Sequence, residues 1–107
     1  MARQPLLSTL AWRDLESVRS YTVEKWGRDQ WLRYYLGLTQ ALQWIADDPA
    51  CGRPRYLFAK GLRSLAYEKH LIFFAPITHA GGAPVVLRII HQRQNLAALT
   101  YYEDLEG

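Results

Sequence analysis

A single glycine, Gly27, separates two long helical patterns in the first half of the chain. Over residues 10–26 and again over residues 29–48, apolar side chains return every three or four positions, which is the repeat of an amphipathic helix. Ser8 is placed to cap the first helix, and Pro49 cannot continue the second. Because only one residue lies between the helices, the pattern predicts an antiparallel helical hairpin, with Gly27 in the left-handed conformation.

The remaining apolar runs have the composition of strands. Residues 62–67 and 69–75 predict a hairpin, residues 85–92 predict a last strong strand, and residues 6–7 predict a short first strand. A further extended piece is expected at residues 56–58. The order of strand, two helices and a three-stranded antiparallel meander predicts an α+β fold with one sheet and both helices packed on one of its faces.

The 107 residues are enough for one domain, expected to span positions 1–107. The one cysteine, Cys51, cannot form an internal disulfide or a cysteine-based zinc site, which fits a reducing compartment. Arg13 and Asp14 interrupt the N-terminal apolar stretch before a signal peptide could form, and no apolar run is long enough to span a membrane. The sequence therefore predicts a soluble cytoplasmic protein without a membrane partner.

Motifs of catalysis and cofactor binding are absent from the sequence. It holds no nucleophile elbow, phosphate-binding glycine loop, pair of catalytic carboxylates or HExxH pattern. We therefore expect no catalytic residue, no cofactor and no metal site. His91 shares a predicted strand with apolar neighbours, where a histidine is more often a buried hydrogen-bonding group than a catalyst or a metal ligand.

Basic charge is concentrated in the strand half. Residues 1–50 hold six Lys or Arg and six Asp or Glu, residues 51–96 hold seven Lys or Arg against Glu68 alone, and residues 97–107 hold three acids and no base. This segregation predicts a positive sheet face for an anionic or acidic partner, although such cations can also form an ordinary solvated surface. The candidate target-binding residues are Lys60, Arg63, Arg88, His91 and Arg93.

Strand alternation places Arg88 and Ile90 on one face of the last strand, and Leu87, Ile89 and His91 on the other. No base-stacking aromatic residues are interleaved among the arginines. The pattern therefore argues against direct nucleic-acid binding and favours a protein target.

The two helices carry more aromatic side chains than one buried stripe each can hold. The first stripe is expected to contain Ala11, Leu15, Val18, Thr22 and Trp26, and the second Trp31, Tyr34, Tyr35, Leu38, Leu42 and Ile45. The large side chains outside them include Trp12, Tyr21, Leu36 and Trp44. These residues either flank the core or meet a partner.

These features occur in the order found in a known family. The matching pieces are Leu7-Ser8, Asp14-Leu15, Trp26-Gly27, Gly52-Arg53, Gly61-Leu62-Arg63-Ser64, Ile72-Phe73-Phe74 and Arg88-Ile89-Ile90-His91 with Arg93. In their order and spacing the chain resembles the ParE branch of the ParE/RelE superfamily of bacterial toxins over positions 7–93.

The resemblance implies a RelE/ParE-like fold and a role as the toxin of a type II toxin–antitoxin system. Such a toxin inhibits DNA gyrase by protein binding, has no reaction of its own, and is neutralised by a cognate ParD-like antitoxin that lays a helix and an extended segment over it. The residues implied to bind the antitoxin are Trp12, Tyr21, Trp31, Tyr35 and Trp44.

Two departures from the family pattern leave an alternative open. The segment from His91 to Asn95 lacks the carboxylate that relatives commonly carry there, and an acidic tail with two tyrosines follows it. The alternative is a RelE-like, ribosome-dependent mRNA endonuclease, which would hold phosphate and shuttle protons. Its loosely matching residues are Lys60, Arg63, His91, Arg93 and Tyr101 or Tyr102.

Overall fold

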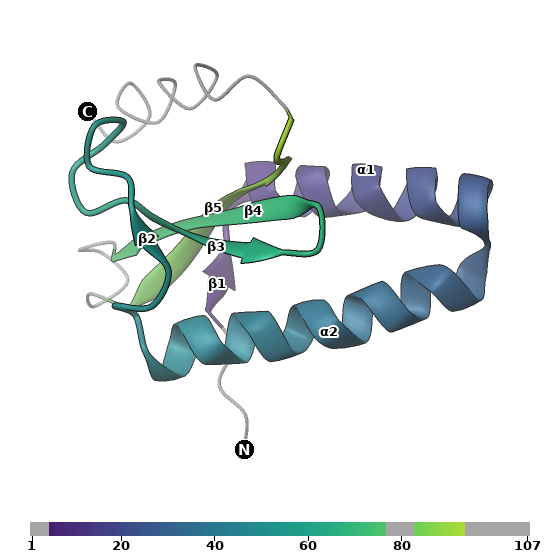
Figure 1. Ribbon diagram of the computed structural model, residues 1–107, viewed down its shortest axis with the longest axis horizontal. Helices are drawn as coiled ribbons and strands as arrows, with labels where there is room; N and C mark the ends of the chain where they lie inside the picture. The colour runs from purple at the N-terminus through teal and green to yellow at the C-terminus, as the bar shows by residue number, and fades with distance from the viewer. Residues whose placement is uncertain (1–4, 77–82, 94–107) are drawn as a thin grey trace.

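The computed structural model of the chain describes residues 5–76 and 83–93 of 107. Two long helices form a hairpin whose tip projects beyond a five-stranded sheet (Figure 1). In chain order the elements are β1 (Leu6–Leu7), α1 (Thr9–Trp26), α2 (Arg28–Asp47), β2 (Arg53–Pro54), β3 (Arg63–Tyr67), β4 (His70–Pro76) and β5 (Pro84–His91).

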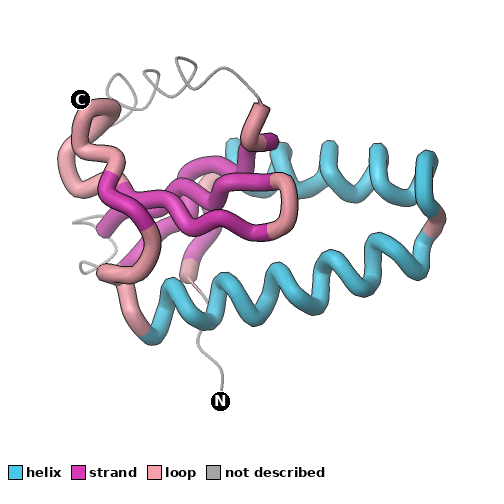
Figure 2. Tube along the Cα trace, viewed as in Figure 1, coloured by secondary structure: helices cyan, strands magenta, loops and turns pink. Residues whose placement is uncertain are grey.

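The strands lie in the order β1-β5-β4-β3-β2, with β1 parallel to β5 and every other pair antiparallel (Figure 2). The predicted α+β class, helical hairpin and β3-β4-β5 meander are thus confirmed. The extended piece expected at residues 56–58 is wrong, because these residues form a turn. The extended piece is β2 instead, where Arg53 pairs with Ser64 and Pro54 with Arg63 at the sheet edge.

Gly27 is both the C-cap of α1 and the N-cap of α2. Its N–H donates to the Val23 carbonyl at 3.0 Å, and its backbone has φ 93° and ψ 168°. The positive φ agrees with the prediction, but the extended ψ does not, since a left-handed residue has ψ near +47°. The next helix starts at once, so the chain reverses through a conformation that is almost confined to glycine.

Replacing Gly27 should destabilise the protein because of backbone strain alone, since no atom lies within 4 Å of an added Cβ. We expect Gly27→Ala and Gly27→Asn each to lower the free energy of unfolding by about 1–3 kcal/mol. Denaturant titration measures both. Asparagine tolerates the left-handed helical region, so a rescue of stability by Asn relative to Ala would contradict the extended ψ.

The core lies on both faces of the sheet. On the helix-covered face, Leu38, Leu42 and Ile45 of α2 and two residues of α1 pack against the sheet. The full cluster of buried residues there is Ala11, Leu15, Leu38, Leu42, Ile45, Cys51, Leu65, Ile72, Phe74, Val86 and Ile89. A second cluster contains Leu62, Phe73, Ala75, Leu87 and Ile90.

A bulge in β5 corrects one expectation of the sequence analysis. Phe73 pairs with Arg88 and Phe74 with Val86, so Leu87 is an extra residue on β5. Such an insertion breaks the strict alternation of side chains. Leu87 therefore belongs to the second cluster and Ile89 to the helix-covered one, whereas regular alternation had placed them on the same face.

Candidate functional site

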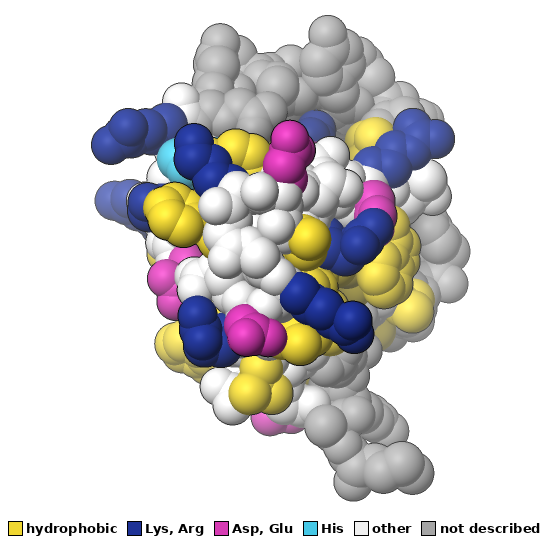
Figure 3. All heavy atoms as spheres, turned by 90° about the vertical axis from the view of Figure 1, so that its right-hand side faces the viewer, with side chains coloured by type: hydrophobic (Ala, Val, Ile, Leu, Met, Phe, Trp, Pro, Cys, Tyr) yellow, Lys and Arg dark blue, Asp and Glu magenta, His cyan; other side chains and the backbone are white. Residues whose placement is uncertain are grey.

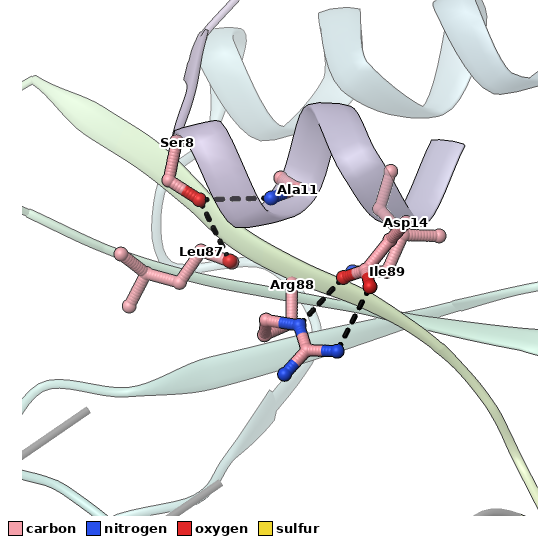
Figure 4. Close-up of polar contacts among 6 residues, drawn as sticks. All are labelled: Ser8, Ala11, Asp14, Leu87, Arg88 and Ile89. Carbon is pink, nitrogen blue, oxygen red and sulfur yellow. Dashed lines mark hydrogen bonds and ion pairs between the residues drawn. The ribbon is translucent and has the colours of Figure 1, made fainter. Parts of the chain in front are cut away.

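The start of α1 is joined to β5 by polar groups (Figure 4). The Ser8 side chain donates to the Leu87 carbonyl at 2.8 Å and accepts from the Ala11 N–H at 3.0 Å, as expected for a helix cap. One turn further, Asp14 accepts from the Ile89 N–H at 2.9 Å. These contacts fix the helical hairpin on the sheet.

Arg88, a candidate target-binding residue, belongs to this junction. Its Nε and Nη2 donate to the two carboxylate oxygens of Asp14 at 2.6 and 2.8 Å, and the two side chains are only 17% and 15% exposed. The hydrogen bond that Arg88 donates to Asp14 raises the pKa of Arg88. The guanidinium is therefore held by a structural ion pair and presents little surface to a target.

Replacing Asp14 by Asn should destabilise the fold, because Arg88 would keep a largely buried charge without a carboxylate partner. We expect a loss of about 2 kcal/mol, the range of a charged hydrogen bond. The matched control is Glu16→Gln, which breaks the exposed Glu16–Arg19 pair of the same helix and should leave the unfolding midpoint nearly unchanged. Equal unfolding midpoints for the two variants would show that the junction does not hold α1.

Arg63 also has a structural role. Its Nε donates to the Cys51 carbonyl at 2.9 Å, Nη2 to the Gly52 carbonyl at 3.2 Å and Nη1 to the Tyr56 hydroxyl at 3.1 Å. These bonds fasten the segment that leads into and out of β2.

Cys51, whose carbonyl Arg63 binds, has a thiol with a pKa raised by burial. This thiol is therefore protonated at neutral pH and is a poor nucleophile.

The five candidate target-binding residues do not converge on one site. Arg63 is the first residue of β3 and pairs with Phe74 of β4, and the exposed Lys60 lies three residues before Arg63. His91 and the exposed Arg93 lie at the other end of the sheet, where His91 pairs with His70. Because β3 spans four residue steps between these ends, the two groups are separated by about 13 Å along the strands.

His91 and His70 do come together, which the sequence alone could not establish. Their ring centroids are 5.5 Å apart in an edge-on arrangement, and His91 Nδ1 accepts from the Arg93 N–H at 3.1 Å. His70 Nδ1 is hydrogen-bonded to the Tyr34 hydroxyl at 3.2 Å. Half-buried His91 thus has the hydrogen-bonding role that the sequence analysis favoured over a catalytic one.

Two tyrosines extend this histidine cluster toward α2. The Tyr67 hydroxyl donates to the Tyr34 carbonyl at 2.7 Å, and the two rings lie 5.0 Å apart. Gly37 permits this approach, since a Cβ at position 37 would stand 2.2 Å from the Tyr67 hydroxyl. Burial raises the pKa of both tyrosines, so neither is a ready proton donor at neutral pH.

His70 makes stability depend on pH. Its pKa is lowered from about 6.5, first by burial and second by His91, while Asp14 acts in the opposite direction. Because folding favours the neutral ring, His70 contributes fully to the free energy of unfolding at a pH above the pKa that it has in the unfolded chain. This contribution is lost as the pH falls through the lowered value.

We expect the free energy of unfolding to fall between about pH 7.5 and about pH 5.5, and to fall less in a His70→Gln variant. Denaturant titrations of both proteins at the two pH values measure the difference. Carboxylates contribute equally to both chains, so the comparison isolates His70. The same fall in both proteins would contradict the assignment.

On the face opposite the helices, a shallow cavity of about 360 Å³ was not anticipated from the sequence. Arg55 donates from Nε to the Ser64 hydroxyl at 2.9 Å and lies over the Phe73 ring at 5.9 Å from its centroid. The lining residues are Arg53, Arg55, Ser64, Ala66, Leu71 and Gln92. The concentration of arginines around Gly52 was the available sequence signal.

The candidate antitoxin-binding residues lie on the helices, and most of them are exposed. Trp12, Tyr21 and Trp44 are 54%, 60% and 53% exposed, and Tyr35 is 40% exposed. Trp31 is half-buried, stacked on Tyr34 at 5.8 Å and packed against the helix-covered core. Four of the five residues therefore present exposed aromatic surface, and the fifth, Trp31, lies 5.5 Å from the Tyr35 ring.

Trp26 was expected to close the buried stripe of α1, and this expectation is wrong. The stripe ends at Thr22, and Trp26 is 66% exposed because the tip of the hairpin extends past the sheet that would cover it. Leu32 and Leu36 of α2 are exposed as well. Seen from the hairpin end, hydrophobic side chains are interspersed with Lys and Arg and with several Asp or Glu over the surface (Figure 3).

This geometry agrees with known proteins. Residues 6–96 match the family model described as ParE toxin of type II toxin-antitoxin system, parDE. This chain belongs to the ParE toxin family. Toxin ParE1 of Mycobacterium tuberculosis is 33% identical over 96 residues, covering 90% of this chain and 96% of the relative.

One further relative and one solved structure are also similar to this chain. Toxin ParE1 of Caulobacter vibrioides is 29% identical over 92 residues, covering 86% of this chain and 92% of the relative. A solved chain from the chromosomal ParDE TA system of P. aeruginosa has the same fold, with a TM-score of 0.63 at 22% identity, over 84% of this chain and 96% of that one. The ParE membership implies an antitoxin partner.

Other kinds of site are poorly supported in the described part of this ParE chain. Within residues 5–76 and 83–93, no three His, Cys, Asp or Glu side chains lie close enough together to hold a metal ion. Neither α1 nor α2, the helices described, combines the length and apolar composition needed to cross a membrane. Tyr101 and Tyr102, considered for the nuclease alternative, and the acidic tail lie outside the described residues.

Proposed function

We propose that this ParE toxin inhibits DNA gyrase by protein binding in the cytoplasm and is neutralised by a ParD-like antitoxin. The observation that carries the proposal is the separation of its cationic residues. A phosphodiester-cleaving site needs several donors converging on one phosphate. Here Lys60 and Arg63 lie about 13 Å along the strands from His91 and Arg93.

The chemistry of the individual side chains points the same way. Arg63 and Arg88 use their guanidinium groups inside the fold, on the β2 segment and on Asp14. The thiol and tyrosine groups near the sheet have raised pKa values. We therefore propose a toxin without a reaction of its own, and we regard exposed Lys60 and Arg93 as the candidate cations that remain available to a protein target.

We propose that the antitoxin binds to the helical hairpin. Exposed Trp12, Tyr21, Tyr35 and Trp44 supply the large rigid side chains that dominate protein interfaces, and half-buried Trp31 contacts Tyr35. Trp12 and Tyr21 are nine residues apart and so lie on opposite sides of α1, and the same holds for Tyr35 and Trp44 on α2. An antitoxin that buries all four rings therefore covers the hairpin from more than one side, with a helix and an extended segment whose carboxylates meet Lys25, Arg28 or Arg33.

The function is tested by supercoiling of relaxed plasmid by gyrase, with and without purified antitoxin. We expect the toxin to block supercoiling and the antitoxin to restore it, and we expect ribosome-bound mRNA to stay intact. Cleavage of that mRNA with normal supercoiling would establish the nuclease alternative instead.

The variants Trp44→Ala and Tyr21→Ala test whether the antitoxin binds to the helical hairpin. Each should weaken antitoxin binding by about 10-fold or more, because an interface aromatic is lost. Calorimetric titration measures the affinity. Tyr56→Ala is the control, since Tyr56 is similarly exposed on a loop away from the hairpin and should bind antitoxin normally. Unchanged affinity in both helix variants would refute binding to the hairpin.

A further inference from the structure

The turn between β2 and β3 presents the most exposed apolar residue of the described chain. Leu57 is 101% exposed, and Tyr56 beside it is 58% exposed. Single exposed leucines are common and need no explanation. This one differs because the turn that carries it is firmly built and because its surroundings carry charge of one sign.

Hydrogen bonds close the turn from within. The Arg55 N–H donates to the Leu62 carbonyl at 2.8 Å, and the Phe58 N–H donates back to the Arg55 carbonyl at 3.0 Å. The Leu62 N–H donates to the Ala59 carbonyl at 3.2 Å. The backbone on both sides of Leu57 is therefore fixed, and little conformational entropy would be lost when the turn met a partner.

Side chains fasten the same turn to the sheet. Phe58 and Ala59 pack against the second core cluster, and Arg63 holds the Tyr56 hydroxyl at 3.1 Å. Leu57 alone points away from every one of these contacts, as its exposure shows. A rigid turn that presents one apolar side chain has the form of an interface anchor.

The charges around the turn define the partner. Exposed Lys60 and Arg53 lie within or next to it, whereas Arg55 and Arg63 are bound to Ser64 and to the backbone of the β2 segment. No Asp or Glu occurs in the sequence from Pro49 to Tyr67. Lys60 is exposed, and Arg53 and Arg55 line the shallow cavity on the adjoining sheet face. The complementary surface is an apolar pocket with carboxylates around its rim.

The turn lies far from the tip of the helical hairpin, whereas Trp44 stands near the end of α2 that leads into β2. Figure 1 places the connection between β2 and β3 at the end of the molecule opposite the hairpin tip. The turn and the hairpin tip are therefore separate surfaces, and the proposed function requires two protein partners.

We propose that Tyr56 and Leu57 form the contact by which this toxin engages its target, with Leu57 entering an apolar pocket on the target protein and Lys60 facing carboxylates at its rim. The inference rests on the proposed function, in which the target is a protein, and it assigns the target-binding surface to the β2–β3 turn. It keeps Lys60 from the predicted target-binding residues and replaces the strand arginines by Tyr56 and Leu57 of the turn.

The test compares Leu57→Ala and Leu57→Asp with Leu6→Ala, an exposed leucine of β1 at the other sheet edge. Because Leu57 makes no core contact, its variants should fold normally, which circular dichroism and antitoxin affinity verify. We expect Leu57→Ala to raise the concentration for half-inhibition of gyrase by about 10-fold or more, and Leu57→Asp to raise it further, since it adds repulsion. Leu6→Ala should inhibit like wild type.

Growth arrest on controlled expression, at equal protein levels, provides a second measure that does not depend on which protein is the target. If wild type leaves gyrase active, the proposed function fails. In that case, loss of growth arrest in the Leu57 variants still supports the turn as the target contact. If Leu57→Asp arrests growth and binds antitoxin as wild type does, the inference is overturned.

Discussion

The arrangement of this fold depends on how α1 completes the edge of β5. β1 pairs with β5 over only two residues, Leu6 opposite Val85 and Leu7 opposite Val86. Beyond that point Ser8 and Asp14 take the place of a strand, since Ser8 binds the Leu87 carbonyl and Asp14 the Ile89 N–H. Because residues at the start of α1 bond to the β5 backbone as a strand would, the position of α1 on the sheet is fixed. Gly27 then joins α2 to α1 and sets where α2 begins.

Contacts that hold the fold together also change the interpretation of the basic charge in the strand half of the chain. Net charge in the strand half suggested a positive face, but the fold itself uses several of those cations: Arg88 on Asp14, Arg63 on the β2 segment and Arg55 on Ser64 and Phe73. Partly buried cations need such partners, because removing them from water costs several kcal/mol when they are left alone. A sum of charges along a sequence therefore overstates the cationic surface left for a target.

The parts of the structure that depend on local pattern were predictable from the sequence. The helices follow from 3.6-residue periodicity, the hairpin from Gly27, and the cap from Ser8. The remainder depends on distant partners. The Asp14–Arg88 pair joins residues 74 positions apart, the β5 bulge reverses the face of Leu87, and β2 has two residues, too few for any alternation. Trp26 followed the helical period but lies beyond the sheet, so periodicity placed it wrongly in the core.

The proposed surfaces differ in the apolar area that they offer. About half of each exposed hairpin aromatic, on the order of 100 Å² apiece for four side chains, represents roughly 10 kcal/mol of burial when all four are covered, before the costs of association. Leu57 alone can contribute about 1.5–3 kcal/mol, to which Tyr56 and Lys60 add. If the antitoxin binds the hairpin as proposed, its affinity therefore draws on a larger apolar area than Leu57 offers to the target, as neutralisation of the proposed toxin would require.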